Sequence, residues 1–305
     1  MIIKSESYNL KLSEDETLLY SAGKDVRAYD INLTIPAEVM RIKDIHEPFW
    51  MDLSSDGKHI SVSNTSGEIF ICDTDSGNIR IKNKCLSEEL VGIYYVDNDK
   101  GVLSCTFDGR IFILDVEHNK CEIIESLHAT VPKICPTHDP NFYLILYSDN
   151  SSGFSYIYKI DISKTKADLI AEDKLRTIID NSPTSNGCKV YFFSYNHQEN
   201  IHELMCFNVE TNKNICLANV DKLFKVNKIH CDIDSFDFLR ISNNGNCFAL
   251  YGMDNLLLFD IQEKKLIANL SYDCISDVHF CCEDTKIIVG TWNDIQIIEF
   301  DRIIN

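Results

Sequence analysis

The sequence predicts an all-β fold, a seven-bladed β-propeller with four antiparallel strands in each blade, on three observations. First, a short apolar or aromatic segment that ends in Asp or Asn recurs seven times along the 305 residues. Second, the recurrences are 43, 42, 46, 47, 52 and 41 residues apart, and a period of roughly 40 to 50 residues is typical of propeller blades. Third, turn-forming pairs such as Asp-Gly and Ser-Gly separate the apolar runs. The recurring segments end at Asp30, Asp73, Asp115, Asp161, Asn208, Asp260 and Asp301.

The second repeat shows the four expected strands, which we name a to d in chain order. Strand a is expected at residues 49–53 (FWMDL), strand b at 59–64, strand c at 68–73 and strand d at 79–82. The a–b turn at 54–58 (SSDGK) contains Asp-Gly, which supplies the left-handed backbone conformation that a tight turn needs. Strands b and c are largely apolar on both sides, as expected for a sheet that packs on both faces. One repeat therefore corresponds to one blade.

The other six repeats follow the same order of strands and turns. The fourth has a longer b–c connection at residues 148–153, and the fifth is the longest, with its b–c turn at 196–200. These blades are expected at residues 11–30, 94–115, 134–161, 177–208, 238–260 and 278–301.

The seventh blade is expected to be completed by the start of the chain. Only four residues follow Asp301, so this repeat lacks a strand d of its own. Residues 1–4 (MIIK) are mostly apolar, and we expect residues 1–5 to supply that strand and close the ring. Closure is favoured because an open array of sheets leaves backbone edges unpaired, and the alternative is a frayed terminus. Since the repeats fill the chain, residues 1–305 are expected to form a single domain.

The repeats resemble the WD40-repeat family of seven-bladed propellers. The resemblance is carried by residues 290–301 (GTWNDIQIIEFD), with Phe300 at the position of the usual Trp, and by the turns at 54–58 and 242–246. It covers nearly the whole chain and implies the propeller fold. No blade has a Trp-Asp pair or opens with Gly-His, so the family's buried Asp–His–Ser/Thr–Trp network is not carried over. Quinoprotein-like and other seven-bladed propellers stay open as alternatives.

The strongly acidic balance of the chain limits its partners. The formal net charge is −18. Such a surface repels a nucleic-acid backbone and an anionic membrane, so neither is expected as a partner. It attracts a basic protein, although acidity that serves only solubility is the alternative interpretation.

The cysteines and the start of the chain predict a cytoplasmic protein. The thirteen cysteines form no Cys-x-x-Cys motif, and several, such as Cys72, Cys105, Cys206 and Cys247, lie in predicted strands as small apolar side chains. Many unpaired thiols suit a reducing compartment. The first ten residues (MIIKSESYNL) have no long apolar core, and no run approaches the length of a membrane span.

No catalytic motif is present, so we expect no enzyme, no cofactor and no metal. The sequence has no phosphate-binding loop, no His-Glu-x-x-His and no Gly-x-Ser-x-Gly. His197 and His202, with Glu199 or Glu203 as a third ligand, are the one candidate metal set, and solvated loop histidines are the simpler interpretation.

Large apolar residues at turn tips predict a contact surface. Strands alternate in direction, so the b–c turns and the d–a links lie on one rim of the ring. Turn tips are normally small and polar, whereas aromatic residues and Met are enriched in interfaces. The alternative is that each side chain folds back onto its own blade, above all Trp50 on an inner strand. The candidate partner-binding residues are Phe107, Met253 and Trp292 from b–c turns, Phe49 and Trp50 from the d–a side, and the acidic Asp25, Asp108, Asp254 and Asp294.

Together these features predict a non-enzymatic protein–protein interaction module or scaffold. It is expected to be a monomer on its own and to bind a basic protein partner on the b–c/d–a face. Two other hypotheses remain at this point. One is an inhibitor or immunity-type protein that occludes a basic enzyme, and the other is a metal-dependent propeller hydrolase or lyase.

Overall fold

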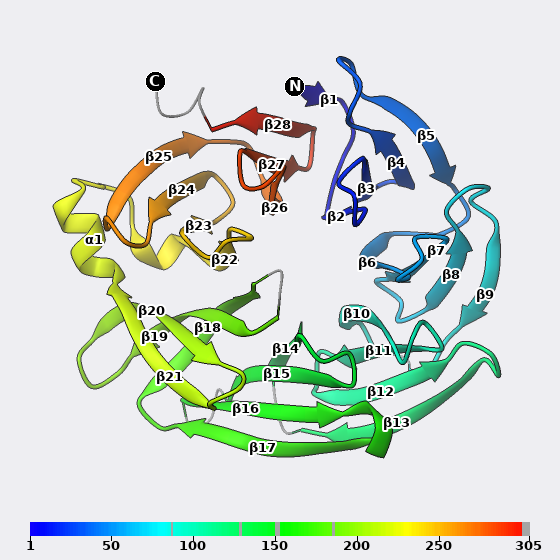
Figure 1. The fold of residues 1–305 in the computed structure, drawn as a ribbon, viewed down its shortest axis with the longest axis horizontal. Coiled ribbons are helices and arrows are strands. Elements are labelled where there is room, and N and C mark those ends of the chain that lie inside the picture. Colours follow the sequence, from blue (N-terminus) through cyan, green and yellow to red (C-terminus); the bar gives the residue numbers. More distant parts are fainter. Residues whose placement is uncertain (87, 128–129, 150–152, 185–186, 301–305) are drawn as a thin grey trace.

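Seven four-stranded antiparallel sheets are arranged in a ring around a central axis (Figure 1). The computed structural model describes residues 1–86, 88–127, 130–149, 153–184 and 187–300. In each sheet strand a lies nearest the axis and strand d lies at the outside (Figure 1). The predicted seven-bladed β-propeller is therefore confirmed.

Blades 1 to 4 follow one another along the chain, and each pairs its strands in the order a-b-c-d. Their strands are β2 (Asn9–Leu12), β3 (Leu18–Ala22), β4 (Val26–Asp30) and β5 (Ala37–Ile42); β6 (Pro48–Leu53), β7 (His59–Asn64), β8 (Ile69–Asp73) and β9 (Ile79–Asn83); β10 (Leu90–Val96), β11 (Gly101–Thr106), β12 (Arg110–Asp115) and β13 (Lys120–Ser126); β14 (Thr130–Pro136), β15 (Phe142–Asp149), β16 (Phe154–Asp161) and β17 (Lys166–Asp173).

Blades 5 and 6 keep this order, and blade 7 combines strands from both ends of the sequence. Their strands are β18 (Arg176–Pro183), β19 (Lys189–Asn196), β20 (Ile201–Asn208) and β21 (Lys213–Asn219); β22 (Phe238–Ile241), β23 (Cys247–Tyr251), β24 (Asn255–Asp260) and β25 (Lys265–Ser271); β26 (Ile275–Cys281), β27 (Lys286–Thr291), β28 (Ile295–Glu299) and β1 (Ile2–Ile3).

The strand β1 closes the ring, as predicted. It pairs antiparallel with β28, with Ile2 opposite Gln296 and Ile3 opposite Ile295. The α-amino group of Met1 donates to the carbonyl oxygen of Ile297 (2.8 Å), which extends this short ladder by one residue. The side chain of Ile3 is buried between blades 7 and 1.

An insertion between blades 5 and 6 was not expected from the sequence. It contains the helix α1 (Val220–Val226) and the 3₁₀ helix η2 (Ile233–Ser235), and a further 3₁₀ turn, η1 (Ile162–Lys164), lies in blade 4. The side chain of Asn219 caps α1 by accepting a hydrogen bond from the backbone N of Lys222 (2.8 Å). This insertion accounts for the longest step in the repeat.

The hydrophobic core is divided among the contacts between blades. Within the described residues, seven apolar clusters occur, and each draws its buried side chains from two neighbouring blades. Between blades 5 and 6, for example, Phe248 and Phe259 stack with their ring centroids 4.9 Å apart beside the fully buried Phe193. Each blade is thus stabilised by both of its neighbours, so that ring closure matters for all of them.

A buried aspartate on the inner strand β26 connects three blades. Asp277 accepts a hydrogen bond from the backbone N of Leu10 in blade 1 (3.0 Å) and pairs with Nη2 of Arg240 in blade 6 (2.7 Å). Burial opposes ionisation of this carboxyl group, but Arg240 and His279 outweigh burial and hold its pKa below the usual range. Asp277 is therefore a charged link between blades 6, 7 and 1.

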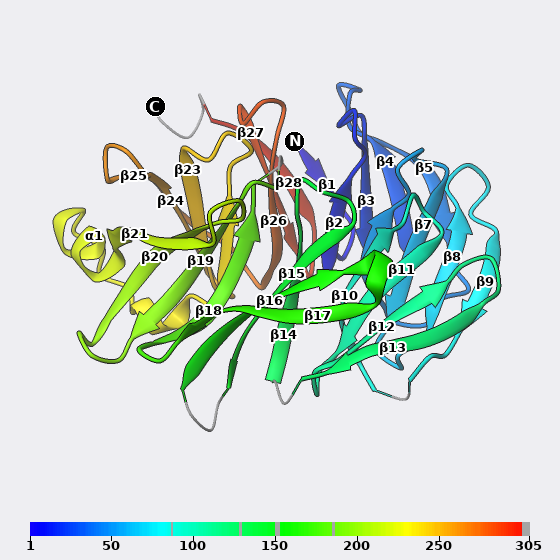
Figure 2. The same cartoon turned by 60° about the horizontal axis from the view of Figure 1, so that its bottom comes forward.

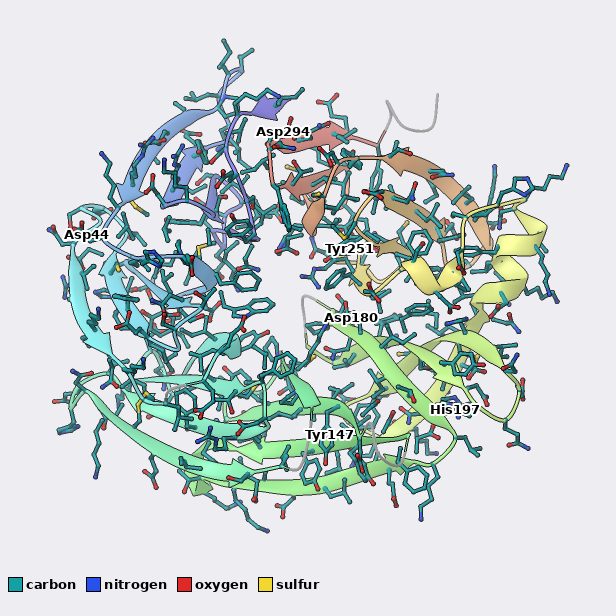
Figure 3. All side chains as sticks on the ribbon, turned by 180° about the vertical axis from the view of Figure 1, so that it is seen from behind. Asp44, Tyr147, Asp180, His197, Tyr251 and Asp294 are labelled. Carbon is teal, nitrogen blue, oxygen red and sulfur yellow. A yellow bond between two sulfur atoms is a disulfide. The ribbon has the colours of Figure 1, made fainter. Side chains whose placement is uncertain are left out.

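Two other inner aspartates repeat this arrangement. Asp180 in β18 lies beside the axis of the ring (Figure 3). It pairs with Lys133 of blade 4 and accepts a hydrogen bond from the backbone N of Leu239 in blade 6 (2.7 Å). The third set is Asp52 with Nζ of Lys11 (2.5 Å) and the backbone N of Tyr95 (2.7 Å). These carboxylates thus accept hydrogen bonds that connect neighbouring blades.

The expectation of unpaired thiols is wrong for one pair of cysteines. Cys85, after β9, and Cys121 in β13 form a disulfide that joins the outer parts of blades 2 and 3, with their Cα atoms 5.6 Å apart. They are 36 residues apart in sequence, so local spacing did not reveal the pair. Cys72, Cys105 and Cys206 carry free thiols and are buried as predicted.

Within the part of the chain that the structure describes, no helix has the length and apolar character needed to cross a bilayer.

Candidate functional site

The b–c turns and the d–a links lie together on one rim of the ring. The backbone N of Ser7, in the link into blade 1, donates to the carbonyl oxygen of Thr291 at the b–c turn of blade 7 (3.0 Å). The backbone N of Phe107, in the b–c turn of blade 3, likewise donates to Glu89 in the link into that blade (3.2 Å). These contacts bring the two sets of loops together, as the alternation of strand direction predicts.

The three apolar residues predicted at b–c turns are all exposed. Trp292 is 51% exposed, Phe107 49% and Met253 56%. Half of each side chain therefore remains in contact with solvent rather than folded onto its own blade.

Four aromatic rings form a continuous row across blades 7, 1 and 2. The rings of Trp292 and Tyr8 meet edge to face, with their centroids 6.4 Å apart. Tyr8 stacks on Phe49 at 6.2 Å, and Phe49 meets Trp50 edge to face at 5.2 Å. These separations lie in the range of favourable aromatic pairs, so each ring holds the next in place. We call these four residues the aromatic row.

Trp50 anchors one end of the row to the next blade. It is half-buried, and its Nε1 donates to the carbonyl oxygen of Leu90 at the start of blade 3 (2.9 Å). The structural role weighed for Trp50 is therefore observed. Glu89 and Leu90 separate Trp50 from Phe107, so the apolar rim continues into blade 3.

Met253 extends the rim at the other end. Its carbonyl oxygen accepts a hydrogen bond from the backbone N of Ile275 (2.7 Å). The preceding residue, Cys274, accepts one from the backbone N of Trp292 (3.2 Å). Met253 and Trp292 thus flank the same link between blades 6 and 7. Together with the aromatic row and Phe107, Met253 forms an apolar rim that spans blades 6, 7, 1, 2 and 3.

The carboxylates of two predicted acidic residues, Asp294 and Asp25, already form hydrogen bonds or ion pairs with other residues of the chain. Asp294 is buried and holds the b–c turn of blade 7 through Oγ1 of Thr291 (3.2 Å), while Nζ of Lys4 lies 2.9 Å from its carboxylate. Burial raises the pKa of Asp294, but these bonds outweigh burial, so the net shift is downward. Asp25 is half-buried and pairs with Nη2 of Arg27 (3.1 Å).

The other two acidic residues differ from each other. Asp108 is exposed but accepts a hydrogen bond from Oγ1 of Thr106 (2.5 Å), which lowers its pKa, and it also pairs with Arg110 (3.1 Å). Asp254 is exposed, and no Lys, Arg or His of the described residues lies within 4 Å of its carboxylate. Asp254 is therefore the predicted carboxylate most available to a partner.

A groove of about 560 Å³ opens beside the aromatic row at Tyr8. Residues 43–47 form one wall, and the b–c turn of blade 1 forms another. Gly23 in that turn cannot carry a side chain, because a Cβ there would lie 2.3 Å from the carbonyl oxygen of Glu6. The exposed residues that line the groove include Glu6 and Asp44 and also Lys24 and Lys43. Figure 3 labels Asp44 at the outer margin of the ring.

Tyr8 was not identified from the sequence, although a signal was present. Leu12 pairs with Leu19 as Leu53 pairs with Ile60, and Tyr8 precedes Leu12 by the same number of residues as Phe49 precedes Leu53, although β6 has a register shift between Pro48 and Met51. Aligning the two inner strands rather than only the ends of the repeats would have revealed it.

The two candidate metal-binding histidines face different partners. Nε2 of His197 lies 2.7 Å from Oγ1 of Thr177. His202 is buried between Asp221 of α1 and Asp234 of η2 (3.4 and 3.2 Å). Among the described residues, no three His, Cys, Asp or Glu side chains are arranged to hold one metal ion.

The fold and this rim define a seven-bladed β-propeller with a preformed apolar and aromatic face. No protein-family model matches the chain, and no curated protein matches it in sequence. Many solved structures are similar to it, among them the following two. One is hydrazine synthase of Kuenenia stuttgartiensis, with a TM-score of 0.77 and 12% identity over 97% of each chain. The other is the β-propeller domain of Cps50 (Swd1) from Myceliophteria thermophila, with a TM-score of 0.77 and 13% identity over 98% of this chain and 99% of that one.

At such low identity these similarities show the fold alone. One of the two proteins is an enzyme by its name, so the fold itself does not select a function.

Proposed function

We propose that this chain is a non-enzymatic interaction scaffold that binds a protein partner on the b–c/d–a rim of blades 6, 7, 1, 2 and 3. The observation that carries the proposal is the aromatic row, flanked at its two ends by the exposed Met253 and Phe107. Rigid aromatic side chains lose little conformational freedom when they are covered, which makes them effective anchors of an interface.

The partner is proposed to be basic at the surface that meets this rim. Exposed carboxylates outnumber exposed lysines here, and a Lys or Arg side chain placed over Trp292 or Tyr8 would gain a cation–π contact as well. The acidic net charge of the whole chain would add steering over longer range. The exposed carboxylates belong to Glu6, Asp44, Glu47, Glu89, Asp108, Asp254 and Asp273.

A matched pair of triple variants tests the proposal. The first is Phe107→Ala, Met253→Ala and Trp292→Ala on the rim. The control is Ile123→Ala, Leu169→Ala and Ile215→Ala on the outer strands of blades 3, 4 and 5, whose side chains are 52%, 48% and 55% exposed.

Both proteins are used as bait beside the wild type in native lysate, and captured proteins are identified by mass spectrometry. We expect a partner that the wild type and the control retain and that the rim variant loses at least about tenfold. If both variants capture the partner equally well, the b–c/d–a rim is not the binding surface.

The two other hypotheses are tested by the same preparation. A captured basic enzyme whose activity falls on binding would make the scaffold an inhibitor. The hydrolase or lyase hypothesis requires a metal ion near the central channel. Elemental analysis of the purified protein tests it, because a preparation without stoichiometric metal would remove this hypothesis.

A further inference from the structure

The helix α1 is fixed firmly to the ring. Its side chains Leu223 and Phe224 are buried in the cluster between blades 5 and 6. The ring of Phe224 lies 5.8 Å from Phe236 and 6.3 Å from Phe259. His202 of blade 5 also contacts the carboxylate of Asp221 near the start of the helix. The outward face of α1 is therefore presented by a rigid support at the outer margin of the ring (Figures 1 and 2).

The outward face of α1 carries exposed lysines, and a neighbouring turn adds more. Asn227, at the end of the helix, donates through Nδ2 to the carbonyl oxygen of Lys264 (3.3 Å) and accepts from the backbone N of Leu266 (2.9 Å). These bonds bring the c–d turn of blade 6 against the helix end. The exposed lysines of the two segments are Lys222, Lys225, Lys228, Lys264 and Lys265, which we call the lysine patch.

The five lysines of the patch form no ion pair with any residue that the structure describes. No carboxylate of the described residues lies within 4 Å of any of its ammonium groups, although other exposed lysines, such as Lys58 and Lys82, do pair. Asp221 faces His202, and Glu263 is the one acidic residue in the adjoining turn. The helix dipole accounts for a basic residue in the last turn of α1, but not for the two lysines that blade 6 contributes.

We propose that the lysine patch binds a short acidic segment of a protein partner. Five unpaired cations on one surface of a chain with a net charge of −18 form a local attraction for carboxylates. Val226 lies between these lysines with its side chain 66% exposed, so an apolar residue within the acidic segment would be covered there.

The surroundings of the patch favour a short segment over an extended polyanion. The helix is seven residues long, or about 10 Å. A nucleic-acid strand or a membrane surface extends beyond a Debye length of about 8 Å and would meet the acidic remainder of the surface. The patch also has no arginine for bidentate phosphate contacts and no exposed aromatic ring for base stacking.

The test is direct binding of a fluorescent peptide to the full chain, followed by anisotropy at low salt. The probe is a short peptide of aspartate and glutamate around one central leucine, and its control replaces every acid with the corresponding amide. The patch variant is Lys222→Gln, Lys225→Gln and Lys228→Gln. Of these, Lys222 and Lys225 lie in α1, where Gln and Lys have nearly equal helix propensity.

The matched control variant is Lys84→Gln, Lys100→Gln and Lys120→Gln, which changes the net charge equally at exposed sites elsewhere. We expect the wild type and the control variant to bind the acidic peptide alike, and the patch variant to bind it about tenfold more weakly with an unchanged circular dichroism spectrum. The amide peptide should bind to none of them.

Three results would overturn the proposal. One is equal weakening in both variants, which would show a general effect of charge. Another is the absence of binding to the wild type. The third is tighter binding of a single-stranded oligothymidylate than of the acidic peptide, which would assign the patch to nucleic acid. Because the probe does not involve the b–c/d–a rim, the result is independent of the proposed function.

Discussion

The inner strands and the b–c/d–a rim differ in how completely neighbouring blades cover and pair their side chains. On the inner strands, Asp180 and Asp277 are 1% and 2% exposed, and each has a cationic partner and a backbone donor in neighbouring blades. On the rim, Trp292 and Met253 remain half exposed. The comparison teaches that satisfied groups hold the ring together, whereas incompletely covered ones remain available to a partner.

Removing the closing strand is expected to have the largest effect. Deletion of residues 1–4 would remove the buried side chain of Ile3, expose the apolar surface that it covers between blades 7 and 1, and remove the backbone bonds between β1 and β28. We expect a loss of about 4 kcal/mol from the free energy of unfolding and a fall of about 10 °C in Tm. The substitution Ile2→Ser is the control, because that side chain is 56% exposed and should leave Tm nearly unchanged. A deletion variant with the same Tm as the wild type would contradict the role of β1 in stabilising the closed ring.

The second effect separates an inner aspartate from one on the rim. Asp277→Ala would leave Arg240 without its carboxylate, and we expect a loss of about 3 kcal/mol in urea-induced unfolding. Asp108→Ala, on the exposed rim, should cost less than about 1 kcal/mol. Similar losses in the two variants would break the distinction between the inner strands and the rim.

A dependence on pH should follow from the same aspartate. The folded protein holds the pKa of Asp277 below its ordinary value of 3.8, so this group adds stability above that pH. The contribution is lost as the pH falls below 3.8 toward the folded pKa. We therefore expect Tm to fall between about pH 4 and pH 2 more steeply in the wild type than in Asp277→Asn. If Tm falls equally steeply with decreasing pH in both proteins, ionisation of Asp277 does not determine the loss of stability in acid.

The rim variant should have the smallest effect on stability. Because Phe107, Met253 and Trp292 are half exposed, replacing all three with Ala should lower Tm by no more than about 3 °C. Differential scanning calorimetry of this variant beside the outer-strand control measures it. A much larger fall would mean that the rim serves stability rather than recognition.

The features predicted from the sequence are those that repeat locally. The Asp-terminated segments predicted the seven blades, and the apolar start of the chain predicted the closing strand. Large residues at turn tips marked Trp292, Phe107 and Met253 as candidates, but the sequence left open whether they fold back onto a blade, and the structure shows them half exposed.

The features that were missed depend on contacts between distant residues. Asp277 and Leu10 are 267 positions apart, and nothing in either segment alone indicates their hydrogen bond. A charged residue within an otherwise apolar inner strand was the available signal. The helix α1 was missed because its seven residues are stabilised chiefly by packing on blades 5 and 6, rather than by a long periodic pattern.

Site-specific photocrosslinking tests the central claim most directly, because it reports which surface the partner covers. Trp292→p-benzoylphenylalanine places the crosslinker on the rim, and Leu169→p-benzoylphenylalanine places it at a side chain of similar exposure on an outer strand. We predict that one protein crosslinks efficiently from position 292 and from position 107 but not from position 169. A partner that crosslinks from position 169 and not from the rim would contradict the account.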